Sequence, residues 1–300
     1  MTDLPSSVRL TTGRGGLPVL LVDGPAARGE IYLHGATVTD WTPAGRDPVL
    51  WVSPAAQFTR DTAIRGGVPI CFPWFGALAG HPQAPSHGFA RLSDWTLAGA
   101  QDDGENVTVR LRLTDDEATR SSAWPHPFEA VYTVVFGSRL TLALEVTNRG
   151  SHEVVIEEAL HTYYRVHDIR AAEVTGLEGA AFSDRLAGPG PEAGEPGPVR
   201  FGSETDRTYL GTTAATMIRD PGAGRCVAIS KDGSAATVVW NPWIDKARAM
   251  GDFGDDDWQR MLCVEVANIG QTAIRLAPSG SHTMSATFEL RPDPDAKETR

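Results

Sequence analysis

The chain has 300 residues and a formal net charge of −11 at pH 7, from 27 lysines and arginines against 38 aspartates and glutamates. This acidic balance excludes the broad basic surface needed to bind nucleic acid or an anionic membrane, so an anionic ligand would need a local basic pocket. The opening residues, MTDLPSSVRL, lack a signal-peptide pattern, and no apolar run approaches the roughly 18 residues of a membrane span. We therefore expect a cytoplasmic protein.

The cysteines agree with that location. Cys71, Cys226 and Cys263 are odd in number, widely separated and without the paired spacing of a metal site. We expect them to be reduced and to serve as small core residues.

In chain order, strand patterns dominate. Residues 107–113 (VTVRLRL) alternate apolar with basic or polar side chains, as a half-buried antiparallel strand does. Residues 130–136 and 140–148 flank the short turn GSR, which predicts a hairpin. Residues 152–166 are rich in β-branched and aromatic side chains and predict another long strand. Further strands are expected at 235–240, 261–266 and 282–290.

Helical periodicity is weak throughout the chain. Only short helical turns are expected, near 115–122 and 254–260, where Asp255, Asp256 and Asp257 can cap and charge a first turn.

Two segments read as irregular. Residues 184–200 are crowded with glycine, proline and charged side chains, and predict an exposed loop because strand patterns resume on both sides. The tail 291–300 is expected to fray. Together these features predict an all-β protein: one large antiparallel β-sandwich domain spanning residues 1–300.

The first candidate for chemistry is His161. Because side chains alternate along a strand, His161 shares a face with Tyr163, Arg165 and His167. Such a polar and aromatic face suits the concave surface of a sugar-binding sheet. A hydrogen-bonded structural histidine is the open alternative.

The second candidate is Glu265, which shares its strand face with Met261, Cys263 and Ala267. Burying a charged carboxylate is costly unless it is paired or poised for proton transfer. Desolvation would raise its pKa toward the range of a general base near neutral pH. Alternatively, Glu265 lies at a strand end and simply reaches water.

A basic group precedes an apolar and aromatic run. Arg65 opens RGGVPICFPWFG, and His87 and Arg91 follow in SHGFAR. The rigid guanidinium fork suits phosphate or carboxylate, although a surface arginine needs no special role. Gly66 and Gly67 permit a tight turn and a close backbone approach to a ligand.

Aromatic side chains could stack on a sugar ring, although core packing is their commoner use. The candidates are Trp74, Phe75, Trp240 and Trp243. The acidic residues at 252–257 do not follow calcium-loop spacing, and we find no glycine-rich phosphate loop or nucleophile elbow. Nothing in the sequence calls for a metal.

Taken together, these segments resemble the aldose 1-epimerase superfamily, and more closely its glucose-6-phosphate 1-epimerase (hexose-6-phosphate mutarotase) branch. The matches run in order from about residue 60 to 270: RGGVPICFPWFG, HGFAR, EEALHTYYRVHDI, ETDRTY, VVWNPW and MLCVEVANI. The resemblance implies a galactose-mutarotase-like β-sandwich, also called a supersandwich.

The resemblance also implies roles for individual residues. His161 in EALHTYY and Glu265 in CVEVANI match the catalytic pair of the family. His87 matches a second active-site histidine, Asp206 an acid that binds sugar hydroxyls, and Arg65 with Arg91 the phosphate-binding residues. Relatives acting on free sugars also carry an arginine near this motif, so the pair indicates phosphate better than Arg65 alone. The expected substrate-binding set is Arg65, His87, Arg91, Asp206 and Trp240.

The implied reaction is anomer exchange of a hexose 6-phosphate, most simply glucose 6-phosphate. Glu265 would remove the C1 hydroxyl proton while His161 protonates the ring oxygen, with His87 helping to hold that oxygen. No cofactor and no metal are expected. The expected partner is the sugar phosphate alone, without nucleic acid or membrane; the oligomeric state stays open, with a monomer favoured.

Three alternatives remain at this point. The enzyme could act on an unphosphorylated hexose, or on another sugar derivative. A non-catalytic sugar-binding protein could use the same sandwich, because fold alone does not fix function. A binding protein has no need of both an acid and a base, which argues against that alternative.

Overall fold

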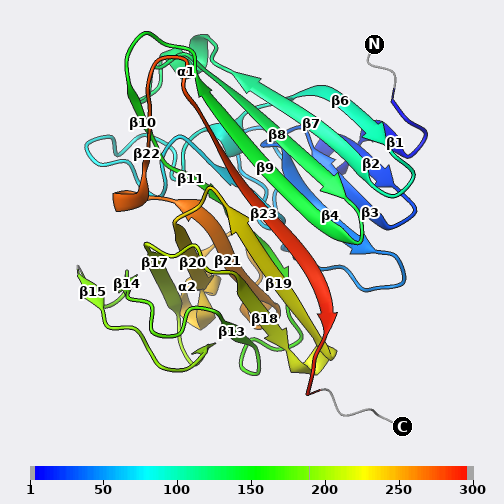
Figure 1. Cartoon of the computed structure of the whole chain (residues 1–300), viewed down its shortest axis with the longest axis vertical. Coiled ribbons are helices and arrows are strands. Elements are labelled where there is room, and N and C mark those ends of the chain that lie inside the picture. Colours follow the sequence, from blue (N-terminus) through cyan, green and yellow to red (C-terminus); the bar gives the residue numbers. More distant parts are fainter. Residues whose placement is uncertain (1–3, 189, 296–300) are drawn as a thin grey trace.

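The structure is a computed structural model that describes residues 4–188 and 190–295, and within them antiparallel strands predominate (Figure 1). The largest sheet has nine strands in the order β16-β13-β18-β19-β23-β9-β8-β7-β6. Its strands are β6 (Thr96–Asp102), β7 (Val107–Thr114), β8 (Phe128–Phe136), β9 (Arg139–Asn148), β13 (Glu173–Thr175), β16 (Val199–Arg200), β18 (Thr216–Asp220), β19 (Arg225–Asp232) and β23 (Ser281–Pro292).

A second sheet has eight strands in the order β15-β14-β17-β20-β21-β11-β5, with β12 also paired to β21. This sheet carries the candidate catalytic residues. Its strands are β5 (Ile70–Cys71), β11 (Glu158–Leu160), β12 (Tyr163–Arg165), β14 (Phe182–Asp184), β15 (Pro191–Glu192), β17 (Thr205–Leu210), β20 (Ala236–Asn241) and β21 (Met261–Asn268).

Two smaller sheets and a few short helices complete the described fold. The four-stranded sheet contains β1 (Val8–Thr12), β2 (Pro18–Asp23), β3 (Ala27–Tyr32) and β4 (Thr37–Pro43), and the two-stranded sheet contains β10 (Val154–Ile156) and β22 (Ile274–Leu276). The helices are α1 (Glu117–Arg120), α2 (Trp243–Ala249) and the 3-10 turns η1 (Arg14–Gly16), η2 (Ala90–Leu92), η3 (Pro221–Ala223), η4 (Asp257–Arg260) and η5 (Gly270–Thr272).

The nine-stranded sheet packs against both the four-stranded and the eight-stranded sheet. The four-stranded sheet packs on its β8–β9 side, where the Trp41 indole N–H donates to the Gly137 carbonyl at 3.2 Å. The eight-stranded sheet packs on its β23 side, where the rings of Tyr164 and Phe288 lie 5.2 Å apart. Buried hydrophobic residues from both interfaces form one connected cluster that runs from Val8 to Phe288. The predicted all-β sandwich class is confirmed.

Several local predictions are confirmed. β7 alternates buried and more exposed side chains, and β8 and β9 form the expected hairpin, with Phe136 opposite Leu140. A helical turn begins after Asp116, whose carboxylate accepts the Thr119 N–H at 2.8 Å. The second expected turn is η4. The helix α2 was not predicted, because its seven residues are too few to show a helical period.

The prediction of one long strand over 152–166 is wrong. The segment divides into β10, β11 and β12, which pair with different partners: β10 with β22, β11 with β21 and β5, and β12 with β21. The β-branched and aromatic side chains of this segment reflect its burial and do not indicate one continuous strand. The three short strands are mostly buried and pair with different partner strands.

The two irregular segments are partly as expected. Most residues of 184–200 are exposed, although β15 and β16 form short pairings within the segment. The tail is more ordered than predicted: β23 runs to Pro292, and the buried Asp293 accepts from the Arg219 guanidinium at 2.9 Å. Residues 296–300 of the expected frayed tail lie outside the described residues.

The three cysteines are free and buried, as predicted. Within residues 4–188 and 190–295, none of the helices combines the length and the apolar character required to cross a bilayer.

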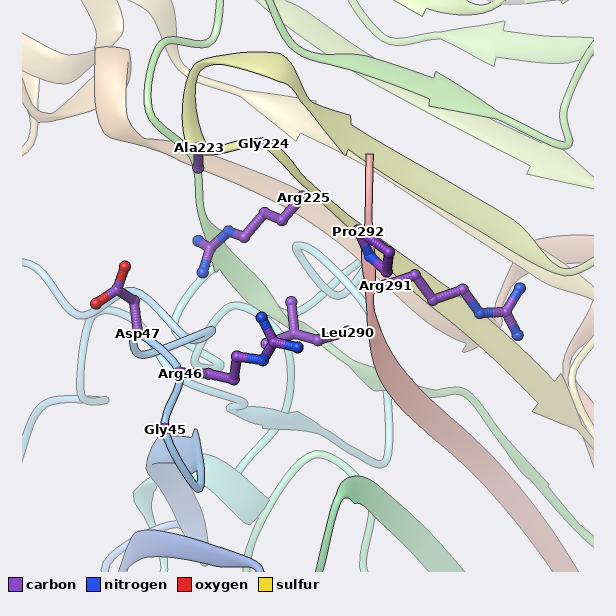
Figure 2. Close-up of a pocket in the computed structure, with 9 residues that line it drawn as sticks. All are labelled: Gly45, Arg46, Asp47, Ala223, Gly224, Arg225, Leu290, Arg291 and Pro292. Atoms are coloured by element: carbon purple, nitrogen blue, oxygen red, sulfur yellow. The ribbon is translucent and has the colours of Figure 1, made fainter. Parts of the chain in front are cut away.

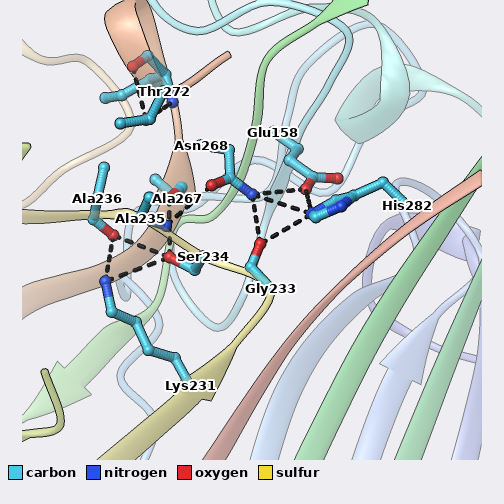
Figure 3. A network of polar contacts seen from close by, with 11 residues as sticks. Glu158, Lys231, Gly233, Ser234, Ala235, Ala236, Ala267, Asn268, Thr272 and His282 are labelled. Carbon is cyan, nitrogen blue, oxygen red and sulfur yellow. Dashed lines mark hydrogen bonds and ion pairs between the residues drawn. The ribbon is translucent and has the colours of Figure 1, made fainter. Parts of the chain in front are cut away.

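A buried polar network joins the strands that carry the candidate catalytic residues (Figure 3). Asn268, at the end of β21, donates to Glu158 Oε1 at 2.9 Å and to the Gly233 carbonyl at 2.7 Å. The Asn268 carbonyl oxygen accepts the Ala235 N–H at 2.9 Å. The His282 ring lies 3.2 Å from Glu158 Oε1, so β11, β21, β23 and the β19–β20 turn meet at one point.

The same turn is also fixed from the β20 side. The Ser234 hydroxyl donates to the Ala267 carbonyl at 2.8 Å, and the Lys231 ammonium donates to the Ala236 carbonyl at 2.7 Å and Thr237 Oγ1 at 2.9 Å. Burial lowers the pKa of Lys231 to about 8, so the amine depends on these acceptors for its charge.

Replacing Asn268 with alanine should destabilise the fold by about 3 kcal/mol, because the buried Glu158 carboxylate and the Gly233 carbonyl would each lose a donor. Chemical denaturation measures the effect. The matched variant Gln101→Ala removes an exposed amide from β6 and should change the free energy of unfolding by less than about 0.5 kcal/mol. Equal stabilities of the two variants would contradict a stabilising role for the network.

Candidate active site

A cavity of about 200 Å³ opens on the eight-stranded sheet and contains most of the predicted site residues. Strands β17, β20 and β21 form its floor, and the segments around β5, β11, β14 and α2 form its walls. The lining residues are Arg65, Phe75, His87, His161, Arg185, Asp206, Val238, Trp240, Lys246, Met250 and Glu265.

His161 and Glu265 meet in this cavity because of strand register. In the β11–β21 pair, Leu160 lies opposite Val266, and in the β12–β21 pair, Tyr163 lies opposite Cys263. The same register places His161 opposite Glu265, and directly opposite residues of an antiparallel pair have neighbouring side chains. The two side chains come to 3.5 Å, between Nε2 of the histidine and Oε1 of the glutamate.

Both members of this pair are buried, and each keeps one polar atom without a partner among the described residues. These atoms are Nδ1 of His161 and Oε2 of Glu265. Buried polar atoms are normally hydrogen-bonded, so both side chains keep an unused hydrogen-bonding atom.

Burial drives the pair toward its neutral form. It lowers the pKa of His161 well below 6.5, with further lowering from His87 and Arg91, and it raises the pKa of Glu265 well above 4.5. Asp206 raises the Glu265 pKa further, while Arg91 and Arg185 oppose the rise. Both directions favour the uncharged forms of the two side chains over the ion pair.

Aromatic rings fix the orientation of the His161 imidazole. Tyr163 stacks on it with centroids 4.8 Å apart, and His87 and Trp240 pack edge-on at 5.6 and 6.0 Å. The ring cannot swing away without breaking these contacts, so its Nε2 remains directed at Glu265.

His87 presents a hydrogen-bond donor. Its Nδ1 accepts the Gly76 N–H at 3.2 Å, so the proton of the neutral ring is on Nε2. Burial, together with Arg91 and Arg185, lowers the pKa of His87 to about 3. The adjacent Gly88 has φ +75, and a Cβ there would lie 2.0 Å from the Phe72 carbonyl oxygen. This glycine allows the loop to pack closely behind His87.

Arg65 lines the cavity and is held in place. Its Nε and Nη2 contact Asp252 Oδ2 at 3.1 and 3.0 Å, and its Nη1 donates to the Tyr163 hydroxyl at 3.1 Å. Gly66 and Gly67 have φ values of +121 and +66, as the expected tight turn requires. A Cβ at either position would collide with main-chain atoms of the neighbouring segments 51–53 and 38–39, so these glycines serve strand packing.

Two cationic residues of the cavity escaped the sequence analysis. Arg185 follows β14 at the start of the segment read as an exposed loop, and Lys246 lies on the unpredicted helix α2. Lys246 pairs with Glu204 at 2.7 Å. The pKa of Asp206 is raised by burial, which Arg185 and Lys246 oppose. No sequence signal distinguished these cations from ordinary surface charge.

Other predicted residues lie elsewhere. Arg91 is not among the residues that line the cavity; its Nη2 donates to the Ser86 carbonyl at 2.7 Å. Its charge nevertheless acts on the pKa values of His161 and Glu265.

Only some of the predicted stacking aromatics, and only some of the residues predicted to share a strand face with His161, lie in or beside the cavity. Phe75 and Trp240 line it, whereas Trp74 donates to the Pro85 carbonyl and Trp243 packs on Trp258 with ring centroids 4.3 Å apart. His161 and Tyr163 lie together as expected. Arg165 and His167 line a different hollow, because the chain leaves the sheet after β12. No cluster of metal-ligating side chains occurs among the residues that the structure describes.

Comparison with known proteins shows the family to which the chain belongs. The sequence model of the aldose 1-epimerase family matches residues 19–289, and the chain belongs to this family. Its fold is therefore that of an anomer-interconverting enzyme, an isomerase of sugars.

Individual relatives of this family are similar to the chain over most of its length. The chain is 36% identical over 256 residues to the “Putative glucose-6-phosphate 1-epimerase” of Escherichia coli, covering 85% of each chain. It is 35% identical over 263 residues to the protein of the same name from Cenchrus ciliaris, covering 83% of this chain and 77% of the relative. The crystal structure of a “putative mutarotase (YeaD)” from Salmonella typhimurium superposes with a TM-score of 0.90 at 30% identity, covering 97% of this chain and 96% of the other.

The environments of two histidines can be checked by NMR. The His87 ring, with its pKa lowered to about 3, should stay neutral as the pH falls from about 8 to about 5, whereas His282 should take up a proton above pH 6.5 because Glu158 raises its pKa. Ring ¹⁵N and ¹³C shifts, assigned with His87→Gln and His282→Gln, measure both. Protonation of His87 within this range would contradict the buried environment described.

Proposed function

We propose that the protein interconverts the α and β anomers of glucose 6-phosphate by acid/base ring opening at His161 and Glu265. The observation that carries the proposal is the 3.5 Å contact between these buried side chains in a cavity that also holds Arg65, Arg185 and Lys246. An acid and a base serve anomer exchange, and the cations supply attraction for a phosphate that the acidic chain as a whole would repel. The names of the relatives agree with this substrate.

The reaction begins with loss of the C1 hydroxyl proton to Glu265 and delivery of a proton from His161 to the ring oxygen. The C1–ring-oxygen bond breaks and an open-chain aldehyde forms. Rotation about C1–C2 presents the other carbonyl face, and reclosure returns both protons. Each positioned proton transfer is worth roughly 10²–10⁴-fold in rate.

A single shared proton satisfies both directions of this cycle. Ring opening converts ionised Glu265 and protonated His161 into protonated Glu265 and neutral His161. Burial favours this second, neutral form, which is the one required for reclosure. Arg91 and Arg185 favour ionised Glu265, the base required for opening, whereas Arg91 also lowers the pKa of His161 and so disfavours the protonated imidazole.

Neighbouring groups would hold the sugar. The neutral His87 ring can donate from Nε2 to the ring oxygen or to an adjacent hydroxyl, because its Nδ1 is already occupied by Gly76. Asp206 lies opposite Trp240 in the β17–β20 pair, so its carboxylate can accept hydroxyl protons beside an aromatic face.

The 6-phosphate is proposed to bind Arg185 and Lys246, with Arg65 contributing from the same cavity. Arg65 already bonds Asp252 and Tyr163, and Lys246 pairs with Glu204, so both charges are partly satisfied. Arg185 makes no ion pair among the described residues. Arg91 is proposed to act indirectly, through its charge. Phosphate recognition therefore includes two residues that the sequence motifs did not indicate.

We further propose that residues 1–300 act as one domain, that the protein is monomeric and that it functions in the cytoplasm. The connected hydrophobic cluster from Val8 to Phe288 supports the single domain, and the free, buried cysteines agree with a reducing compartment. A sugar phosphate is the only proposed partner.

Glu265→Gln should slow anomer exchange of glucose 6-phosphate by about 10²–10⁴-fold, because the amide cannot take the C1 hydroxyl proton. Saturation-transfer NMR measures the exchange, and circular dichroism verifies folding. The control Glu145→Gln removes an exposed carboxylate from β9 and should keep the wild-type rate. A folded Glu265→Gln variant with the wild-type rate would refute the catalytic assignment, and an inactive wild-type protein that binds sugar would favour the non-catalytic alternative.

Lys246→Gln and Arg185→Gln should each raise KM for glucose 6-phosphate about tenfold, because one charge-assisted hydrogen bond to phosphate is lost, and should leave KM for glucose unchanged. Anomer-exchange kinetics on both sugars measure the difference. Arg248→Gln, an exposed arginine on the same helix as Lys246, is the matched control. Equal effects on the two sugars would contradict phosphate recognition and favour an unphosphorylated hexose.

A further inference from the structure

Two adjacent hollows of about 470 and 480 Å³ lie outside the sugar cavity and share none of its lining residues. The turn after β4, the start of β19 and the end of β23 form the first hollow. The end of β12 and the segment after it help to form the second. Asp47, Ala223 and Arg225 line both, so the two hollows are parts of one surface region.

This region is basic although the chain carries a net charge of −11. Two aspartates, Asp47 and Asp220, are the acidic residues of the lining. Asp220 is buried, and both of its oxygens accept the His167 main-chain N–H at 3.1 Å. The five arginines that line the two hollows are Arg46, Arg165, Arg225, Arg260 and Arg291.

Arg225 is fixed at the boundary between the hollows. Its Nη1 donates to the Pro48 carbonyl at 3.3 Å and its Nη2 to the Arg165 carbonyl at 2.8 Å, while its Nε lies 3.6 Å from Asp220. With 13% of its side chain exposed, Arg225 acts as a positioned positive charge rather than a mobile surface group.

Three further arginines have no carboxylate at ion-pair distance among the described residues: Arg46, Arg165 and Arg260. Burial lowers the pKa of Arg165, and the neighbouring Arg225 lowers it further, against the opposing charges of Asp40, Asp257 and Asp47. Like charges held together in this way gain most from a bound anion.

Figure 2 shows which side chains face the first hollow. Arg46 and Arg225 extend into the space between the three segments, whereas Arg291 extends away from it. Arg291 also pairs with Glu289 at 2.8 Å. We therefore exclude Arg291 from the ligand-binding groups.

We propose that this region binds a pyrophosphate group, at a site separate from the sugar cavity. The planar guanidinium matches phosphate oxygens with two parallel hydrogen bonds, and several arginines without a carboxylate partner favour a ligand with more than one negative charge. The described lining residues include no phenylalanine, tyrosine or tryptophan, so recognition rests on the phosphates and not on stacking of a base. Inorganic pyrophosphate and a nucleoside diphosphate share this chemistry.

Isothermal titration of the full chain with inorganic pyrophosphate tests the proposal, in the presence of saturating glucose 6-phosphate to occupy the sugar cavity. The double variant Arg46→Gln/Arg165→Gln should bind about a hundredfold more weakly, about tenfold for each arginine lost. The control Arg112→Gln/Arg149→Gln removes two exposed arginines that pair with Glu129 and should bind as the wild type does. A second titration with ADP identifies the source: equal affinity indicates recognition of the phosphates alone.

The result that overturns the proposal is equal pyrophosphate affinity in the double variant and the wild type, or no binding by the wild type. A parallel titration of Arg185→Gln separates the two sites. Retained pyrophosphate binding by this variant supports an independent site, whereas its loss assigns the binding to the sugar cavity and overturns the proposal. The anomer-exchange rate of the double variant should match that of the wild type, so failure here leaves the proposed catalytic function intact.

Discussion

The antiparallel pairing of β11 and β12 with β21 is the constraint on which the site depends. One register runs through both pairs, from Glu158 opposite Asn268 to Arg165 opposite Met261. A shift of one residue would turn the side chains of either strand to the other face and separate His161 from Glu265. The network around Asn268 fixes this register at one end, because Asn268 also bonds Glu158 across the two strands.

The surrounding structure explains why the chain tolerates a buried acid–base pair. Two isolated ionisable groups in an apolar sheet would be costly, and their pKa shifts oppose charge separation. Aromatic rings of Tyr163 and Trp240 hold the imidazole, while Arg91 and Arg185 moderate the effect of burial on Glu265. The site therefore keeps its proton available without leaving an unbalanced charge in the core.

The sequence revealed more of the catalytic pair than of the residues around it. Period-two alternation identified Glu265 as an acid among buried neighbours, and it placed His161 beside Tyr163, because both signals are local along the chain. The pairing register between them is a long-range property that no local pattern contains. Family resemblance supplied the connection between the two residues.

The sequence did not identify the cationic residues of the cavity correctly. Arg185 lies in a segment whose glycine and proline content indicates only an exposed loop, and Lys246 lies on a helix of seven residues, too short for its periodicity to be recognised. Arg91 was predicted as a phosphate-binding residue because HGFAR resembles the family motif, yet its guanidinium is bonded to the Ser86 carbonyl and does not line the cavity. Sequence proximity to a motif does not fix the direction of a long side chain.

Strand β12 connects the sugar cavity to the proposed anion site, and its pairing limits how the two could influence one another. Tyr163 stacks on His161, and Arg165, two residues later, lines the basic region. Main-chain bonds from Trp51 to the Tyr163 carbonyl and from Arg165 to the Val49 carbonyl, both 2.9 Å, hold one edge of β12, and β21 holds the other. These bonds on both edges oppose a shift of the strand when an anion binds. Any influence of that anion on His161 would therefore be electrostatic. Salt screens interactions between exposed charges strongly and those of buried groups much less.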